Sequence, residues 1–165
     1  MTIPDGLAQE TMEQLRELIQ ALKDEPVSLH DSIARLKHLS EEACEHAGLS
    51  IQWNDMLGEE DTMISSNQHL NILNIVRELI NNTIRHARAN NITVSIRNQK
   101  NTLEVTVTDN GIGFNRQSIT PGNGLHNIQS RVEELDAKID WCTLSGTQVF
   151  LGIPLHHAGA YLGNE

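Results

Sequence analysis

The stretch that most constrains the fold is a strand that runs directly into an acidic, glycine-containing turn. In residues 102–109 apolar and polar side chains alternate, which predicts a strand with one buried face. It leads into Asp109-Asn110-Gly111-Ile112-Gly113. Two glycines one residue apart let the backbone approach a ligand closely, and Asp109 then stands as a fixed hydrogen-bond acceptor. The same residues also form ordinary turns, so this stretch alone leaves ligand contact and a plain turn equally open.

Composition limits the classes of partner. The net charge is -10, and this lack of a basic field argues against a general nucleic-acid or anionic-membrane binder. Cys44 and Cys142 are too few for a disulfide framework or a zinc site. No apolar run approaches the ~20 residues that span a bilayer. We therefore expect a cytoplasmic chain without direct membrane contact, and leave open whether a longer parent protein is anchored in the inner membrane.

Helical patterns precede the first predicted strand. Residues 7–22 have a helical rhythm that ends before Pro26. Ser28 is a predicted N-cap, with Asp31 in a capping-box-like position, and this second helix ends at Gly48. Alternation over 49–53 then predicts a strand, followed by a polar, acidic loop over 57–66.

The longest helical pattern, residues 67–89, has one broad apolar face and a polar strip along its border. Glu78 and Asn82 lie one turn apart on that strip, with Arg85 nearly in line. A carboxylate can accept a proton, an amide oxygen can bind Mg2+, and a guanidinium can meet a phosphate. The alternative is an ordinary solvated helix flank.

The remaining pattern predicts paired strands and one more helix. Strands are expected at 92–97 and 102–109, and again at 138–142 and 147–153. Between the pairs, Gly122-Asn123-Gly124 opens a helix whose N-terminus suits a phosphate. A plain loop before a helix explains these glycines equally, and Gly-x4-Gly-Lys-[Ser/Thr] is absent.

Four motifs in this order resemble the ATP-binding domain of sensor histidine kinases, within the GHKL ATPase fold. Residues 77–87 are similar to the N box of that family, and 109–113 to its G1 box. Residues 122–126 are similar to the G2 box, and Gly146-Thr147 to the last motif. The run 124–135 after a short loop is most similar to the nitrate-sensor and thermosensor-like (HisKA_3-type) branch.

The resemblance implies an α+β fold, a two-layer α/β sandwich with a mixed sheet covered by helices on one face. Residues 49–155 would form the GHKL domain. Residues 1–48 would be a helical lead-in from the dimerisation and linker region, and 156–165 a flexible tail. The implied activity is that of a protein histidine kinase, which transfers the γ-phosphoryl group of ATP.

The resemblance also implies residue roles. Glu78 would be the general base, and Asn82 would bind both ATP and the Mg2+ ion. The other implied ATP-binding residues are Arg85, His86, Asp109, Gly111, Gly113, Gly122, Gly124, Leu125 and Thr147. Asp109 would accept a hydrogen bond from the adenine amino group, and Thr147 would close the adenine pocket.

One expected part is missing. A kinase of this branch needs a phosphoacceptor histidine on a dimerisation hairpin, and only the end of such a hairpin is similar to residues 14–22. His30-Asp31 resembles an acceptor pair, but a capped helix start explains it better. The acceptor domain is therefore expected in cis in a longer parent or in trans, with relay to a response regulator. The isolated chain is not expected to phosphorylate itself.

Two other functions stay open at this point. A stand-alone serine kinase of the anti-sigma-factor type has similar G1 and G2 boxes. A nucleotide-binding regulatory module without transfer activity is the second, although an intact Glu78 weighs against it. The sensed signal, the cognate regulator, the oligomeric state and the extent of the parent protein are not indicated by the sequence.

Overall fold

The computed structural model describes residues 25–113, 123–143 and 145–156, together with residues 11–12, 15–16, 18–19 and 22–23. Its elements are β1 (Val27–Ser28), α2 (Leu29–Ala47), β2 (Ser50–Met56), β3 (Met63–Ile64), α3 (Ser66–Asn82), the π-helical turn η1 (Thr83–Ala87), β4 (Asn91–Gln99), β5 (Thr102–Asp109), α4 (Asn123–Glu134), β6 (Lys138–Cys142) and β7 (Gln148–Pro154). The predicted first helix falls only partly in the described ranges, and its described residues are helical.

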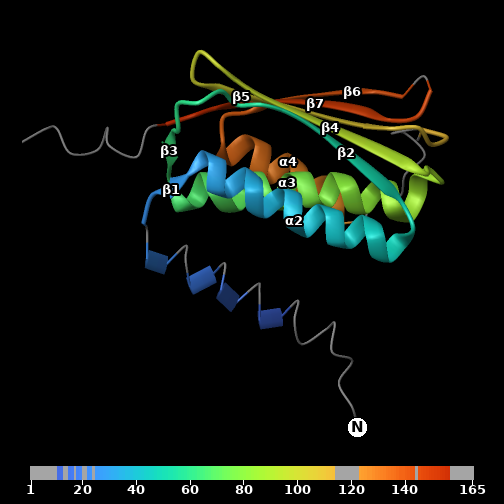
Figure 1. Ribbon diagram of the computed structural model, residues 1–165, viewed down its shortest axis with the longest axis horizontal. Coiled ribbons are helices and arrows are strands. Elements are labelled where there is room, and N and C mark those ends of the chain that lie inside the picture. Colours follow the sequence, from blue (N-terminus) through green and yellow to red (C-terminus); the bar gives the residue numbers. More distant parts are fainter. Residues whose placement is uncertain are drawn as a thin grey trace, which may run out of the picture.

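Five strands form one mixed sheet in the order β2-β4-β5-β7-β6. β2 and β4 are parallel, because α3 carries the chain back between them, while every other pair in this sheet is antiparallel. α2, α3 and α4 all lie on one face of the sheet (Figure 1). The predicted two-layer α+β fold with a mixed sheet is confirmed.

The alternation in the strands explains this layering. In β5 every second residue is buried, from Leu103 to Asp109, and the residues between them are only partly covered. The buried set faces the helices and joins the apolar faces of α3 and α4 in one core. α2 contributes Leu29, Ile33 and Leu36 to the same core, so the packed unit includes a helix that precedes residue 49.

The caps of α2 are those that its sequence predicts. The side chain of Ser28 accepts a hydrogen bond from the backbone N–H of Asp31 at 3.1 Å. Gly48 follows the helix in the left-handed region, with φ of 71°. The acidic loop predicted at 57–66 is not wholly irregular, because β3 lies within it and pairs antiparallel with β1.

The long helix predicted over 67–89 changes character near its end. The α-helical part stops at Asn82 and continues as η1, and Arg88 ends it in the left-handed region, with φ of 50°. The hydroxyl of Thr83 lies within hydrogen-bond distance of the Leu79 carbonyl and of the Asp109 carboxylate, at 3.3 and 3.1 Å. This wider turn therefore begins at a tertiary contact to β5, which the helical pattern cannot indicate.

Candidate functional site

A cavity of about 590 Å3 lies between the inner face of the sheet and the helical layer. A drug-sized or nucleotide-sized ligand fits a cavity of this size. It is lined by Glu78, Leu79, Asn82, Thr83, Arg85, His86, Ala87, Val107, Asp109, Gly113, Gly124, Leu125, Asn127, Trp141, Thr147 and Val149.

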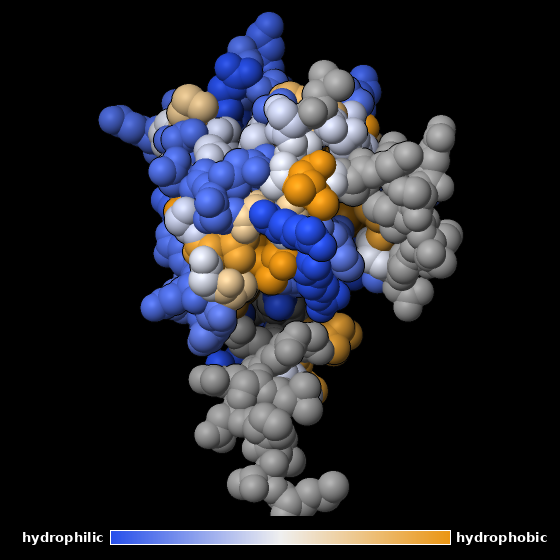
Figure 2. Space-filling view, turned by 90° about the vertical axis from the view of Figure 1, so that its right-hand side faces the viewer, coloured by the Kyte–Doolittle hydropathy of each residue, from blue (hydrophilic) through white to orange (hydrophobic). Residues whose placement is uncertain are grey.

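The lining residues come from elements that end on the same side of the molecule. β5 and α3 run toward the right-hand end of Figure 1, where the turn between β6 and β7 also lies. Figure 2 views that end, where strongly hydrophilic side chains cross a group of apolar ones. This end of the molecule therefore presents both polar and apolar side chains.

Asp109 is the most constrained polar residue in the cavity, with only 4% of its surface exposed. Its Oδ1 accepts hydrogen bonds from the backbone N–H of Gly111 at 2.8 Å and of Thr147 at 3.2 Å. Its Oδ2 accepts one from the hydroxyl of Thr83 at 3.1 Å. Because these bonds fix the carboxylate, its remaining lone pairs offer a rigid acceptor to a ligand.

Two glycines allow the chain to close around Asp109. A Cβ on Gly111 would lie 2.1 Å from the carbonyl oxygen of Ala87, which accepts a hydrogen bond from the Ile112 N–H at 2.8 Å. Gly146 has φ of 84°, and a Cβ there would lie 2.1 Å from the Asp109 carbonyl oxygen. Gly111 therefore serves close packing against η1 and is not among the lining residues.

Gly111→Ala should cost about 1–3 kcal/mol of stability, because the backbone of η1 or of the turn has to move. It should also weaken the binding of any ligand to the cavity, since the same turn holds Asp109. Gly152→Ala is the matched control, because a Cβ there meets nothing closer than 3.9 Å. Urea denaturation of both variants tests this, and equal stability of the two would contradict the close packing.

Glu78 and Asn82 both reach the cavity from α3, one turn apart. The carboxylate oxygen Oε1 of Glu78 occupies the space where Gly124 has no side chain, 2.1 Å from where a Cβ would lie. The acid thus faces the start of α4, whose free N–H groups favour an anion. Arg85 and His86 line the exposed rim.

α4 is fixed against α3 by a partly buried polar contact. Asn71 is 2% exposed, accepts a hydrogen bond from Arg131 at 2.7 Å, and donates one to Glu134 at 3.2 Å. The sequence pattern places Asn71 on the same strip as Glu78, but in the structure it serves this helix contact and does not line the cavity.

The structure brings together most of the residues that the sequence singles out. Glu78, Asn82, Arg85, His86, Asp109, Gly113, Gly124, Leu125 and Thr147 all line the cavity. Gly122 lies outside the described residues. Among the lining residues that the sequence reasoning missed are Thr83, Val107, Trp141 and Val149. The alternation of the strands predicts only that the two valines are core residues. No sequence pattern indicates that Trp141 lies in the same cavity as Asp109.

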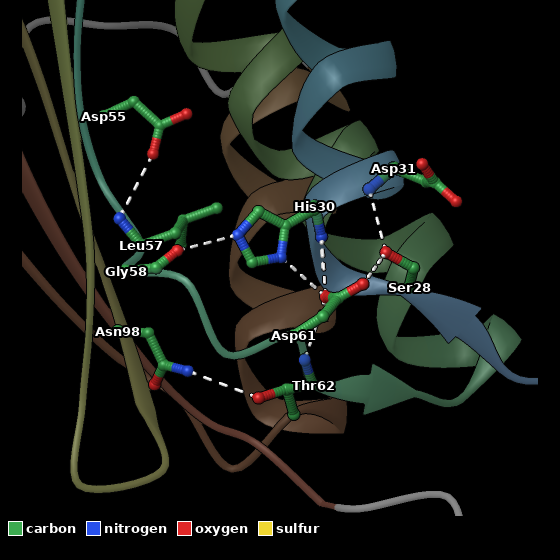
Figure 3. A network of polar contacts seen from close by, with 9 residues as sticks. All are labelled: Ser28, His30, Asp31, Asp55, Leu57, Gly58, Asp61, Thr62 and Asn98. Atoms are coloured by element: carbon green, nitrogen blue, oxygen red, sulfur yellow. Dashed lines mark hydrogen bonds and ion pairs between the residues drawn. The ribbon is translucent and has the colours of Figure 1, made fainter.

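His30 does not have the surroundings of a nucleophile (Figure 3). Its Nδ1 lies 2.7 Å from Oδ1 of Asp61, and its Nε2 lies 3.0 Å from the carbonyl oxygen of Gly58. Both partners only accept hydrogen bonds, so the ring donates from both nitrogens and is held as an imidazolium. Asp61 also accepts hydrogen bonds from the Ser28 hydroxyl and from the His30 backbone N–H.

This pair should make stability depend on pH. The Asp61 carboxylate raises the pKa of His30, and hydrogen bonds from Ser28 and His30 lower the pKa of Asp61. The stabilisation is complete between about pH 4 and 6.5, the unfolded pKa values. It is lost as pH rises through the raised pKa of His30, and also as pH falls through the lowered pKa of Asp61. Both side chains are more than one-third exposed, so solvent screening limits it to about 1 kcal/mol.

His30→Gln should therefore remove part of the stability at pH 6 and little at pH 9, measured by thermal melting. Burial and the charge of Arg35 lower the pKa of His69. The neutral form of His69 is therefore favoured in the folded protein, and His69 reduces stability as pH falls. For this reason the difference between the two proteins is the quantity to compare. A difference that does not change with pH would contradict the imidazolium assignment.

Comparisons with known proteins agree with this geometry. The family described as histidine kinase-, DNA gyrase B-, and HSP90-like ATPases matches residues 67–157. The chain belongs to this ATPase family. The matched range includes nearly all of α3, the turns at Gly111 and Gly146, and β7. These elements all border the cavity.

Several relatives of this ATPase-family chain are sensor proteins. It is 27% identical to sensor histidine kinase LiaS of Bacillus subtilis over 156 residues, which is 92% of this chain and 42% of that protein. It is 34% identical to sensor protein VraS of Staphylococcus haemolyticus over 88 residues, 52% of this chain and 25% of that protein. The chain thus spans less than half the length of these relatives.

Solved structures share the fold. Histidine kinase AdeS of Acinetobacter baumannii superposes with a TM-score of 0.64 at 15% identity, covering 95% of this chain and 88% of that one. The histidine kinase domain of the blue-light activated kinase of Erythrobacter litoralis gives a TM-score of 0.63 at 20% identity, over 74% of this chain and 60% of that one.

The part of the chain that the structure describes has neither a membrane-spanning helix nor a cluster of metal-binding side chains. No helix there is long and apolar enough to cross a bilayer. Nor does that part of the chain hold a group of three or more His, Cys, Asp or Glu side chains that could bind a metal ion.

Proposed function

We propose that this chain is the ATP-binding catalytic domain of a two-component sensor histidine kinase. It would transfer the γ-phosphoryl group of ATP to a histidine on a dimerisation domain, for relay to a response regulator. The observation that carries the proposal is the rigid buried carboxylate of Asp109, in the same cavity as Glu78 and Asn82. One end of the cavity can fix a base, and the other can fix phosphates.

The base end is built by the sheet. Asp109 accepts from the exocyclic amino group of adenine, and Thr147, 7% exposed, borders it. Val107 and Val149 give the apolar floor under the ring. A site with a fixed acceptor binds an amino-purine better than a base that offers a carbonyl at that point, because two facing acceptors would repel each other.

The phosphate end is built by α3, η1 and the start of α4. Asn82 supplies an amide oxygen, and Arg85 and His86 supply donors for phosphate oxygens. Bound Mg2+ would neutralise charge on the triphosphate, and an amide oxygen together with phosphate oxygens and water fits its preference for hard ligands. Glu78 orients the acceptor and takes its proton, while the chain positions the reacting groups.

The acceptor domain is proposed to precede the cavity-bearing unit, as a dimerisation helix pair of the HisKA_3 type. The described helical residues ahead of Pro26 carry exposed apolar side chains, which supports a partner helix there. They are Met12, Leu15, Leu18, Ile19 and Leu22. Relatives more than twice as long as this chain further support a longer parent protein. We also propose that this domain lies in the cytoplasm and that the parent is anchored in the inner membrane.

Phosphate transfer in trans tests the proposal. The chain would be mixed with γ-labelled ATP, Mg2+ and the dimerisation domain of a LiaS-like relative, and the labelled product treated with acid. Acid-labile phosphate on the dimerisation domain is the expected result. Acid-stable phosphate on a serine of the partner would favour the serine-kinase alternative, and ATP binding without transfer would favour a regulatory module.

A further inference from the structure

Trp141 is a cavity residue to which neither the sequence motifs nor the proposed function gives a role. It lies on β6, an edge strand of the five-stranded sheet. Its register partner is Val149 on β7, whose own partner is Val107 on β5. Cross-strand partners point to the same face, so these three side chains form one row across the floor of the cavity.

The row lies next to the polar end of the same cavity. Asp109 is two residues beyond Val107 on β5, and therefore on the same face. Thr147 is two residues before Val149, and its N–H donates to the Asp109 carboxylate at 3.2 Å. The cavity is thus bounded by an acceptor on one strand and by an indole two strands away.

The width between these two groups indicates the shape of the ligand. Two strand spacings of about 4.8 Å place the β5 and β6 backbones about 10 Å apart. A fused two-ring base spans more of this interval than a single ring does. Trp141 is half-buried and packs against the core, so its indole is held in place before a ligand arrives.

We propose that Trp141 is a base-binding residue of the nucleotide site, which contacts the base through its indole and favours purines over pyrimidines. The inference rests on the proposed function, because it requires the nucleotide to occupy this cavity. An aromatic side chain gains from contact with the flat face or edge of a base, and the gain increases with the area of the base.

Trp53 provides an internal control. It is the other of the two tryptophans in the chain, and it lies on β2 at the opposite edge of the sheet. It is half-buried like Trp141 and lies under Lys37, whose Nζ is 5.9 Å from the ring centroid. It does not line the cavity.

Two single-tryptophan variants separate the signals. Trp53→Phe leaves only Trp141, and Trp141→Phe leaves only Trp53. Each would be titrated with Mg-ATP while fluorescence is followed, and ATP binding would be measured in parallel by calorimetry. The emission of Trp141 should change with the same midpoint as the heat, because the base contacts the indole, and the emission of Trp53 should not change.

Trp141→Ala should weaken ATP binding about tenfold or more, by the loss of one base–aromatic contact. Its affinity for Mg-tripolyphosphate should not change, and its preference for ATP over CTP should fall. Trp141→Phe should keep most of the ATP affinity. A merely structural tryptophan would weaken both ligands together and leave the ATP-to-CTP ratio unaltered.

The outcomes separate this inference from the proposed function. No heat on adding ATP to the unaltered chain would overturn the proposed function, and the inference with it. ATP heat without any change in Trp141 emission, together with an unchanged ATP-to-CTP ratio in Trp141→Ala, would overturn the inference alone. If the alanine variant does not fold, the fluorescence titration of Trp53→Phe decides, since its Trp141 is intact.

Discussion

Replacing Asp109 by Asn should weaken ATP binding about 10- to 100-fold while leaving the fold intact. An asparagine can keep Oδ1 as the acceptor for the N–H groups of Gly111 and Thr147. Its new NH2 group can donate to the Thr83 hydroxyl, whose own proton can turn to the Leu79 carbonyl at 3.3 Å. The ligand then meets a donor where it needs an acceptor, at a cost of about 1–3 kcal/mol.

The same substitution should shift specificity. ITP carries a carbonyl where ATP carries an amino group, so the ATP-to-ITP ratio of affinities should fall in the Asn variant. Asp136→Asn is a matched control, because it makes the same charge change at an exposed position just after α4 that does not line the cavity. Calorimetry with both nucleotides measures this. An unchanged ratio with normal ATP affinity would show that Asp109 does not face the base.

Replacing Glu78 by Gln should lower the rate of phosphoryl transfer about 10²- to 10⁴-fold, the usual effect of a lost general base. ATP affinity should change by less than about threefold, because the amide keeps the shape of the side chain against Gly124 and removes only its basicity. The rate is followed as labelled phosphate on an added acceptor domain, and the affinity by calorimetry.

Glu41→Gln serves as the control for this substitution, since Glu41 is an exposed acid on α2 and does not line the cavity. It should have no effect on either quantity. Equal losses of binding and transfer in Glu78→Gln would refute the role of a base and would assign Glu78 to ligand binding.

Local chemistry made much of the fold predictable. The alternation in β5 and the caps Ser28 and Gly48 depend on neighbours within a few residues, and each is found where the sequence places it. The mixed sheet with helices on one face also follows from the order of these patterns. The candidate site came from the resemblance of four motifs to an ATP-binding family, since each motif by itself is explained equally well by an ordinary turn or helix flank.

The features that escaped prediction depend on contacts between distant residues. η1 begins where Thr83 meets Asp109, 26 residues away in the sequence. β1 and β3 are two residues each, too short for an alternation pattern. The sequence analysis assigned α2 to a lead-in outside the domain. An amphipathic pattern shows that a helix has a buried face, but it does not identify the core against which that face packs. Trp141 lies at the cavity because the pairing of β6 with β7 places it beside Val149, and this register is not evident from the sequence.

The two ends of the cavity differ in what holds them. Asp109 is fixed by hydrogen bonds from η1, from its own turn and from Thr147 just before β7, so the base end is formed before a ligand binds. Arg85 and His86 are exposed on the rim and are free to adjust to phosphates. A preformed base site with an adjustable phosphate site implies that adenosine alone should be recognised, with affinity added by the phosphates.

The most direct test of the central claim is calorimetric titration of this chain with Mg-ATP, beside the Asp109→Asn variant. We predict saturable binding of one ATP per chain, weakened in the variant as described above. An absence of heat at millimolar ATP, or equal binding by the two proteins, would contradict the assignment of this cavity as an ATP site.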